Sequence, residues 1–219
     1  MEVAAAGKIA SVVSPDEWFA LPVLTGRLIR LEPLSLEHVT GYLAAAGQDG
    51  DTVFRWLNSA GSTSGAPRTL DDARADIVAA LAARARGERF AYVQLDATTG
   101  EVAGSTSYYD VLPALRTLGI GHTWLGTKWW RRGHNTESKL LMLTHAFDTL
   151  GAARVVWHTD IHNERSQAAI ARLGATREGE LRKHRLRRDG SWRTTVQYSM
   201  TDDDWPAAKA FLTERLTTG

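Results

Sequence analysis

The apolar residues of the chain follow two kinds of spacing. Apolar residues alternate with polar ones over residues 24–34, and they recur at intervals of three and four after Thr69 and after Thr136. Alternation is typical of strands, and the three-and-four spacing is typical of helices that bury one face. The pattern therefore predicts a strand at 24–34, a helix that Thr69 opens, and a helix from Thr136 to Gly151.

Local signals predict the remaining elements. Ser35 and Asn163 can each cap a helix, and Gly174 can end the second of these. Residues 97–100 fit a turn between two strand-like runs, and Asp189-Gly190 fits a two-residue turn in a second hairpin. The expected order is strand, two helices, three strands, helix, strand, helix and two strands, followed by a C-terminal helix.

This order predicts one α/β (α+β) fold in which helices flank a mixed sheet. We expect an N-terminal extension at 1–23, the domain proper at 24–201, and a C-terminal helix at 202–219 that packs on the same domain. Residues 47–68 are rich in Gly, Ser and Asp and predict a long loop with a short helical piece. With 219 residues, 43% of them hydrophobic, the chain can bury one sizeable core.

Composition narrows the functional classes. No apolar run approaches the roughly 20 residues that span a bilayer, and the N-terminus has no long apolar signal core, so we expect a cytoplasmic protein without a membrane partner. The absence of cysteine excludes disulfides, thiolate metal sites and a cysteine nucleophile, and no metal site is predicted. Lys and Arg number 26 against 25 Asp and Glu, so nucleic-acid binding is not expected.

The stretch WWRRGHNT at 129–136 places two arginines and a glycine just before a predicted helix. Backbone N–H groups in a first helical turn lack partners and carry a partial positive charge, which makes them an anion site. Gly133 would let the backbone approach the anion, and Arg131 and Arg132 could add charge-assisted contacts. The alternative is a pair of solvated arginines beside an ordinary turn.

The wider sequence favours the anion site. TWLGTKWWRRGHNTESKLLMLTHAF, followed by VVWHTDIHNERSQAAIARLGA, resembles the GNAT superfamily of acetyl-CoA-dependent N-acetyltransferases and, within it, the RimJ/RimL-like branch. The resemblance covers about residues 24–200. It implies a mostly antiparallel sheet with two splayed parallel strands. In the family's pyrophosphate loop Gly133 matches, while Trp130 and Asn135 depart from the first and last positions.

The resemblance also implies acetyl-CoA as the cofactor. Its pantetheine arm would pair with main chain between the splayed strands, and Asn163 would bind the pantetheine amide. Asn163 can also cap its helix, and the two roles are compatible. The cofactor-binding residues we expect are Trp124, Leu125, Arg131, Arg132, Gly133, His134, Asn135, Thr136, Asn163 and Ser166.

Acyl transfer requires a neutral amine, a stabilised oxyanion and a proton for the departing thiolate. The tyrosine donor of many relatives is missing, and the resemblance implies Ser166 in its place, with a purely structural serine as the alternative. His122 and His184 are candidate bases, because histidine accepts protons near neutral pH. Catalysis by positioning alone, or a water relay from Asp110 or Asp160, remains open.

The acceptor amine is the least defined part of the prediction. RimJ/RimL relatives acetylate protein N-termini and similar sequences modify small molecules, so both kinds of amine acceptor are retained. A homodimer and a catalytically weak CoA-binding sensor also remain open. The side chains that could line an acceptor cleft, if they are not core or solvated residues, are Trp18, Trp56, Trp192, Arg182, Arg185, Arg187 and Arg188.

Overall fold

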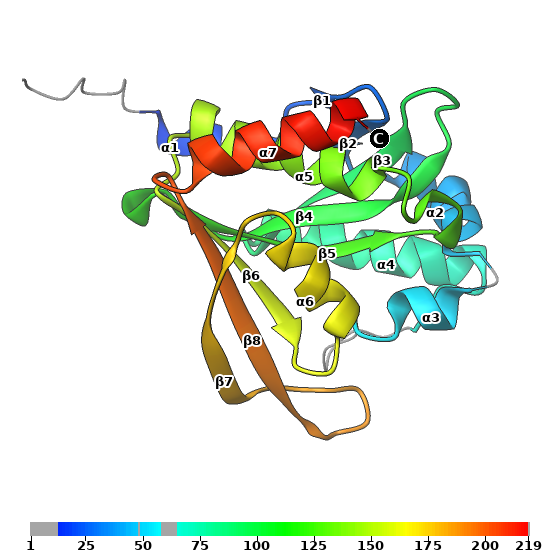
Figure 1. Ribbon diagram of the computed structural model, residues 1–219. Coiled ribbons are helices and arrows are strands. Elements are labelled where there is room, and N and C mark those ends of the chain that lie inside the picture. Colours follow the sequence, from blue (N-terminus) through cyan, green and yellow to red (C-terminus); the bar gives the residue numbers. More distant parts are fainter. Residues whose placement is uncertain (1–12, 48, 58–64, 219) are drawn as a thin grey trace, which may run out of the picture.

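An eight-stranded sheet in the order β1-β2-β3-β4-β5-β6-β8-β7 runs through the protein (Figure 1). The computed structural model describes residues 13–47, 49–57 and 65–218. All neighbouring strands are antiparallel except β5 and β6, which are parallel, so the predicted mixed and mostly antiparallel sheet is confirmed. The strands are β1 (Leu24–Thr25), β2 (Ile29–Pro33), β3 (Arg89–Asp96), β4 (Val102–Leu112), β5 (Thr117–Leu125), β6 (Arg154–Asp160), β7 (Thr176–Leu186) and β8 (Trp192–Thr201).

Helices cover both faces of the sheet. Helices α2 and α4 contact each other and reach β4 and β3, whereas α5 contacts α7, β1 and β2. No helix in the described ranges combines the length and apolar character that a membrane crossing requires. The helices are α1 (Pro15–Phe19), α2 (Val39–Ala46), α3 (Gly50–Phe54), α4 (Leu70–Ala85), α5 (His134–Thr144), α6 (Glu164–Ala171) and α7 (Trp205–Thr218), and a π-helical turn (His145–Thr149) extends α5.

Most predicted elements are confirmed, with four differences. The single strand predicted at 24–34 is instead a short antiparallel hairpin of β1 and β2, in which Leu24 pairs with Leu31. The turn between β7 and β8 has three residues, 188–190, rather than two, because Arg187 N–H donates to the Ser191 carbonyl beyond the ends of the two strands, and Gly190 within the turn has φ +81°. Helix α5 begins two residues before Thr136. Trp18 belongs to a helix that the sequence did not predict and is only 4% exposed in the core, so its suggested place in an acceptor cleft is wrong.

Strands β5 and β6 part after a short parallel segment. Only residues 117–119 pair with residues 154–156. Beyond this point β6 stays with β8 as far as Asp160, and β5 stays with β4 as far as Leu125. The two strands therefore point in diverging directions, which confirms the predicted splay (Figure 1).

A β-bulge lies on β5 just beyond the parting. Trp124 pairs with Ser105 and Gly121 pairs with Ser107, so His122 and Thr123 together face a single residue of β4. His122 adopts φ +49°. A bulge of this kind bends its strand and redirects the extra side chain. The bulge therefore helps β5 turn away from β6 and presents His122 at the opening.

Two charged side chains attach α5 to the sheet. Glu137 accepts hydrogen bonds from the backbone N–H groups of residues 27–29 at 3.0, 2.6 and 2.9 Å. Lys139 is 4% exposed, and its Nζ donates to the hydroxyls of Thr106 and Thr123 at 2.8 Å each. Burial lowers the pKa of Lys139 to about 7. Its hydrogen-bond partners are neutral hydroxyls, so the charged form pays a desolvation cost on folding.

This burial predicts a pH-dependent effect of Lys139→Met. The folded-state pKa of about 7 lies below the unfolded value of about 10.4, so the unfolded chain binds more protons between these values and stability rises with pH across that window. At pH 7 we expect the variant to have a higher free energy of unfolding than the wild type, by an amount that shrinks towards pH 10. Urea unfolding at both pH values measures this difference. A difference that grows with pH would contradict the account.

Candidate active site

The loop before α5 turns into the helix through a glycine in the left-handed conformation. Gly133 is the N-cap of α5 and adopts φ +80°, which disfavours residues with a Cβ atom. A Cβ at this position would also lie 2.8 Å from Leu28 Cδ1. The N–H groups of His134, Asn135 and Thr136 occupy the first turn, where a helix leaves its donors without intrahelical partners. Backbone N–H groups are therefore present where the sequence predicts an anion site.

Two contacts hold this loop against the β3–β4 hairpin. Lys128 Nζ lies 2.5 Å from Glu101 Oε2, and His134 Nε2 lies 2.9 Å from Asp96 Oδ2. The hydrogen bond from His134, with those from Thr98 and Thr99, holds the pKa of Asp96 well below its usual value. The buried His134 ring is therefore structural, and only its backbone remains available to a ligand.

Trp130 connects the same loop to both sides of the opening between β5 and β6. Its indole N–H donates to the Leu125 carbonyl at 2.7 Å. The guanidinium of Arg165, on α6, lies 4.0 Å from the centroid of the Trp130 ring. Trp130 departs from the family pattern in the sequence, and the structure gives it a role that links the loop to α6. The neighbouring Trp124 carbonyl accepts from Gln94 Nε2 at 3.1 Å.

The N-terminus of α6 carries the second predicted motif. Asn163 Oδ1 accepts the Ser166 N–H at 3.1 Å, so the predicted helix cap is confirmed. Both side chains are half-buried. Asn163, but not Ser166, lines a cavity of about 580 Å³, which we call the α6 cavity. Its lining residues are Thr52, Arg55, Trp56, His162, Asn163, Glu164 and Arg165.

The structure brings the two predicted histidines into one cluster through residues that the sequence analysis missed. The Tyr109 hydroxyl lies 2.9 Å from His158 Nδ1, and His158 Nε2 lies 3.0 Å from Gln197 Oε1. Ring centroids are 5.9 Å apart for Tyr109 and His122, and 5.6 Å apart for His158 and His184. Tyr109, His158, His122 and His184 form what we call the histidine cluster.

A sequence signal for the cluster existed in GIGH at 119–122. A Cβ at Gly119 or Gly121 would come within 2.5 or 2.7 Å of the Tyr109 ring. Alternating glycines on one face of a strand can mark a position where another group lies directly on the backbone. The pattern indicates that something covers this face, but it does not identify Tyr109.

Positive charge dominates the surroundings of the cluster. The His122 residue is exposed to solvent, and its ring lies next to that of Tyr109. Desolvation there, together with Arg89, Arg185 and Arg193, lowers the pKa of His122. Desolvation and two of these arginines also lower the pKa of His158 and of His184. All three histidines therefore favour the neutral form, whose free ring nitrogen can accept a proton, and the same shift makes each of them a weaker base than free histidine.

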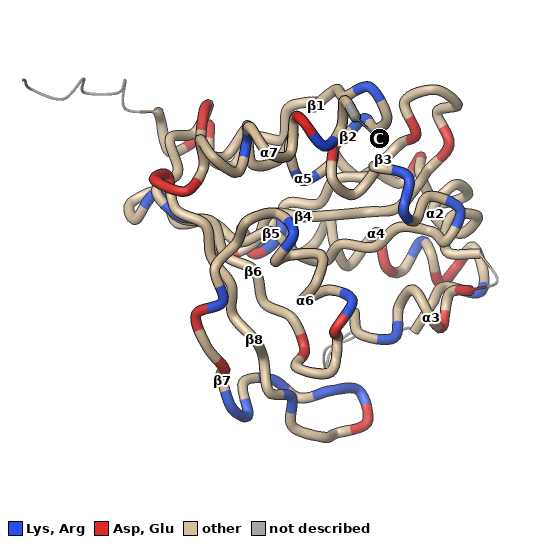
Figure 2. The backbone as a smooth tube through the Cα atoms, viewed as in Figure 1, with Lys and Arg blue, Asp and Glu red and all other residues tan. Residues whose placement is uncertain are grey.

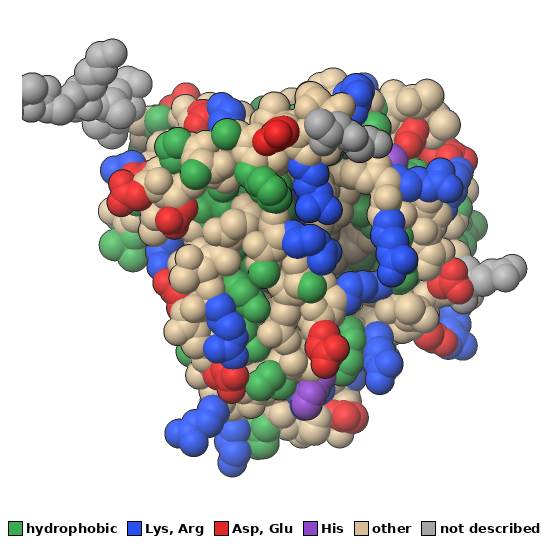
Figure 3. Space-filling view, viewed as in Figure 1, with side chains coloured by type: hydrophobic (Ala, Val, Ile, Leu, Met, Phe, Trp, Pro, Cys, Tyr) green, Lys and Arg blue, Asp and Glu red, His purple; other side chains and the backbone are tan. Residues whose placement is uncertain are grey.

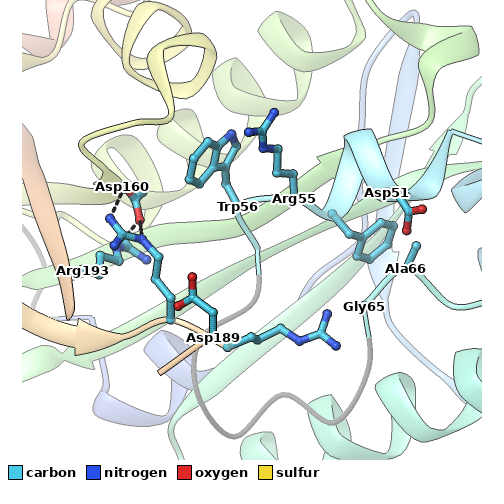
Figure 4. A pocket seen from close by; sticks show the side chains of 11 residues that line it. Asp51, Arg55, Trp56, Gly65, Ala66, Asp160, Asp189 and Arg193 are labelled. Carbon is cyan, nitrogen blue, oxygen red and sulfur yellow. Dashed lines mark hydrogen bonds and ion pairs between the residues drawn. The ribbon is translucent and has the colours of Figure 1, made fainter. Parts of the chain in front are cut away.

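A second cavity of about 410 Å³ lies between α3 and the tip of β7–β8 (Figure 4). Basic side chains gather at this tip, and others surround a hollow on the face that carries α6 (Figures 2 and 3). Three of the side chains that the sequence suggested for an acceptor cleft, Trp56, Arg187 and Arg188, line this cavity. Trp192, Arg182 and Arg185 are not among its lining residues, which are Asp51, Phe54, Arg55, Trp56, Gly65, Ala66, Asp160, Arg187, Arg188, Asp189 and Arg193.

Known proteins are similar to this chain in sequence and in fold. Residues 28–176 match the family described as acetyltransferase (GNAT) domain. The [ribosomal protein uS5]-alanine N-acetyltransferase of Escherichia coli K12 is 27% identical over 121 residues, which are 55% of this chain and 61% of that protein. The alignment thus leaves more than a third of that relative unmatched.

Solved structures extend the likeness over most of the chain. A GCN5-related N-acetyltransferase from Brucella melitensis is 29% identical with a TM-score of 0.81, and the match covers 88% of this chain and 84% of that one. Mycobacterium smegmatis RimJ, solved in complex with CoA-disulfide, is 22% identical with a TM-score of 0.73 over 88% of this chain and 91% of that one. At 22% identity, the match to Mycobacterium smegmatis RimJ is evidence of a shared fold alone.

Proposed function

Because the chain belongs to the GNAT acetyltransferase domain family, we propose that it transfers the acetyl group of acetyl-CoA to a primary amine by direct attack on the thioester. Enzymes of this family use acetyl-CoA. The parting of β5 and β6 is the observation that carries the proposal. It leaves the edge of residues 120–125 beside the N-termini of α5 and α6, where an extended arm with an anionic end can lie.

The residues present fit the cofactor. Its pyrophosphate would lie on the first turn of α5, where backbone N–H groups and the helix dipole favour an anion and Arg131 and Arg132 can add ion pairs. Its pantetheine arm would run along β5 towards Asn163. The Trp130 indole already donates to the Leu125 carbonyl, so the pantetheine amide would share this acceptor through its second lone pair or replace the indole.

The charges around the histidine cluster assist the chemistry. Arg185 and Arg193 lower the pKa of nearby histidines, and the same charges would favour the neutral, nucleophilic form of a bound amine. We assign His122 as the proton acceptor, because the bulge presents it at the opening where the amine would attack. The Tyr109–His158–Gln197 chain orients the surrounding rings.

Ser166 is assigned to the departing thiolate. It lies in the first turn of α6, next to Asn163, and the positive end of that helix favours a developing negative charge. The acceptor would be the amine of a protein N-terminus or of a small molecule. A relative that acetylates a ribosomal-protein alanine supports the first, and the open 410 Å³ cavity can admit either.

Product analysis with acetyl-CoA and a panel of peptides and small amines tests the function. We expect release of one free CoA thiol for each acetyl group that mass spectrometry finds on the amine. Tight acetyl-CoA binding without thiol release on any acceptor would instead support a CoA-binding sensor.

Three substitutions separate the catalytic assignments. Loss of a general acid or base typically lowers the rate about 100-fold to 10,000-fold. We expect His122→Gln and Ser166→Ala to reduce kcat near the low end of that range, with little change in acetyl-CoA affinity. His184→Gln is the matched control, because its ring lies farther along the cluster and is expected to matter little.

The wild-type pH profile adds an independent check on His122. Its pKa is lowered, so we expect kcat to stay level between pH 7 and 9 and to fall only as the pH drops through the histidine pKa. If His122→Gln or Ser166→Ala keeps the full wild-type kcat, the substituted residue has no part in the mechanism.

A further inference from the structure

The cavity between α3 and the tip of β7–β8 is lined by four arginines, and among the described residues only Arg187 has a close carboxylate partner. We infer that this cavity binds an anionic group, a carboxylate or a phosphate, of the acceptor molecule whose amine is acetylated. The inference rests on the proposed function and adds to it the chemical class of the acceptor. We call this cavity the anion pocket.

The carboxylates of the pocket are already engaged. Asp160 binds Arg187 through two hydrogen bonds of 2.7 and 3.0 Å. Asp51 pairs with Arg68 at 3.2 Å, and Asp189 accepts the Ser191 N–H at 2.9 Å. These carboxylates are therefore poorly placed to bind a cation from solution.

Among the arginines of the pocket, Arg187 already has hydrogen-bond partners within the protein. Besides Asp160, its guanidinium donates to the Ser191 hydroxyl at 3.2 Å and to the Trp192 carbonyl at 2.8 Å. Its role is to fix the hairpin tip against the end of β6. The charge available to a ligand must come from the other arginines.

Arg193 is an arginine of this kind, and its side chain is largely buried. Its side chain is 12% exposed, and its Nε has no hydrogen-bond partner among the described residues. Its nearest carboxylate oxygen, Asp160 Oδ2, is 4.0 Å away and already bound to Arg187 (Figure 4). A buried guanidinium with incomplete compensation is costly, and a bound anion would relieve that cost.

Two exposed arginines complete the basic wall. Within residues 13–47, 49–57 and 65–218, neither Arg55 nor Arg188 forms an ion pair. Arg55 lies 5.0 Å from the centroid of the Trp56 ring. Guanidinium groups match carboxylate and phosphate oxygens with paired hydrogen bonds, which favours these anions over a halide.

The position of the pocket connects it to the transfer site. Trp56 and Arg55 line both the anion pocket and the α6 cavity, which contains Asn163. Arg193 also lies close enough to lower the pKa of His122 and His158. An acceptor with its anion on Arg193 would therefore extend towards the histidine cluster, and the amine and the anion would belong to one molecule.

Matched acceptors test the inference. The probes are linear primary amines of increasing length that end in a carboxylate, a phosphate ester or an uncharged amide. We expect the best anionic acceptor to exceed its amide counterpart in kcat/KM by about 10-fold to 100-fold, as expected for a charge-assisted hydrogen bond. Carboxylate and phosphate arms of equal length show which anion the pocket prefers.

Variants then locate the effect. Arg193→Gln should abolish the preference for anionic acceptors, so that kcat/KM becomes equal for the anionic and amide probes, and any loss that acts through the histidine cluster should lower both values alike. The exposed Arg188→Gln should weaken the preference in part, and it keeps the test valid if Arg193→Gln does not fold. Arg182→Gln, on the same hairpin but outside the pocket lining, is the control and should retain the full preference.

A binding measurement separates this inference from the proposed function. Calorimetry with the anionic and amide probes in the presence of CoA needs no turnover. Equal binding or equal kcat/KM of the charged and uncharged probes in the wild type overturns the anion pocket, even if acetyl transfer occurs. Selective anion binding that Arg193→Gln removes supports the pocket even if no tested amine is acetylated, and that result would count against the proposed function alone.

Discussion

The parting of β5 from β6 is the constraint on which the rest of the structure depends. The strands share only three residue pairs, because β6 remains with β8 while the bulged β5 remains with β4. A strand edge without a partner leaves backbone donors and acceptors free for another extended chain. The helix that follows each strand, α5 after β5 and α6 after β6, begins near this opening, so both positive helix ends face the same space.

The two faces of β4 and β5 perform different tasks. Side chains alternate along a strand, so Tyr108 binds the Met142 carbonyl of α5 at 2.7 Å while Tyr109 faces the opposite side and meets the histidines. The α5 face is closed by Glu137 and Lys139. On the other face, the part beside the parted strands is cationic and carries the histidine cluster, whose lowered pKa values favour neutral imidazoles. This environment suits a reaction that begins with a neutral amine and ends with a thiolate.

Sequence reasoning identified what depends on local chemistry. Gly133, the Asn163 cap and the Thr69 cap rely on residues within one turn of each other, and all three are present. It missed contacts between residues far apart in the chain. Examples are Tyr109 with His158, Arg165 with Trp130, and Asp160 with Arg187, which the fold alone brings together. Their residue types carry no local periodicity that would identify a partner.

Hydrogen–deuterium exchange with and without CoA tests the central claim most directly, because it reports on backbone N–H groups along the opening. If the cofactor lies between the parted strands, CoA should slow exchange in residues 120–125 and in the first turn of α5, and leave the β2–β3 pair unchanged. Tight CoA binding that slows exchange elsewhere but not along β5 would contradict the account.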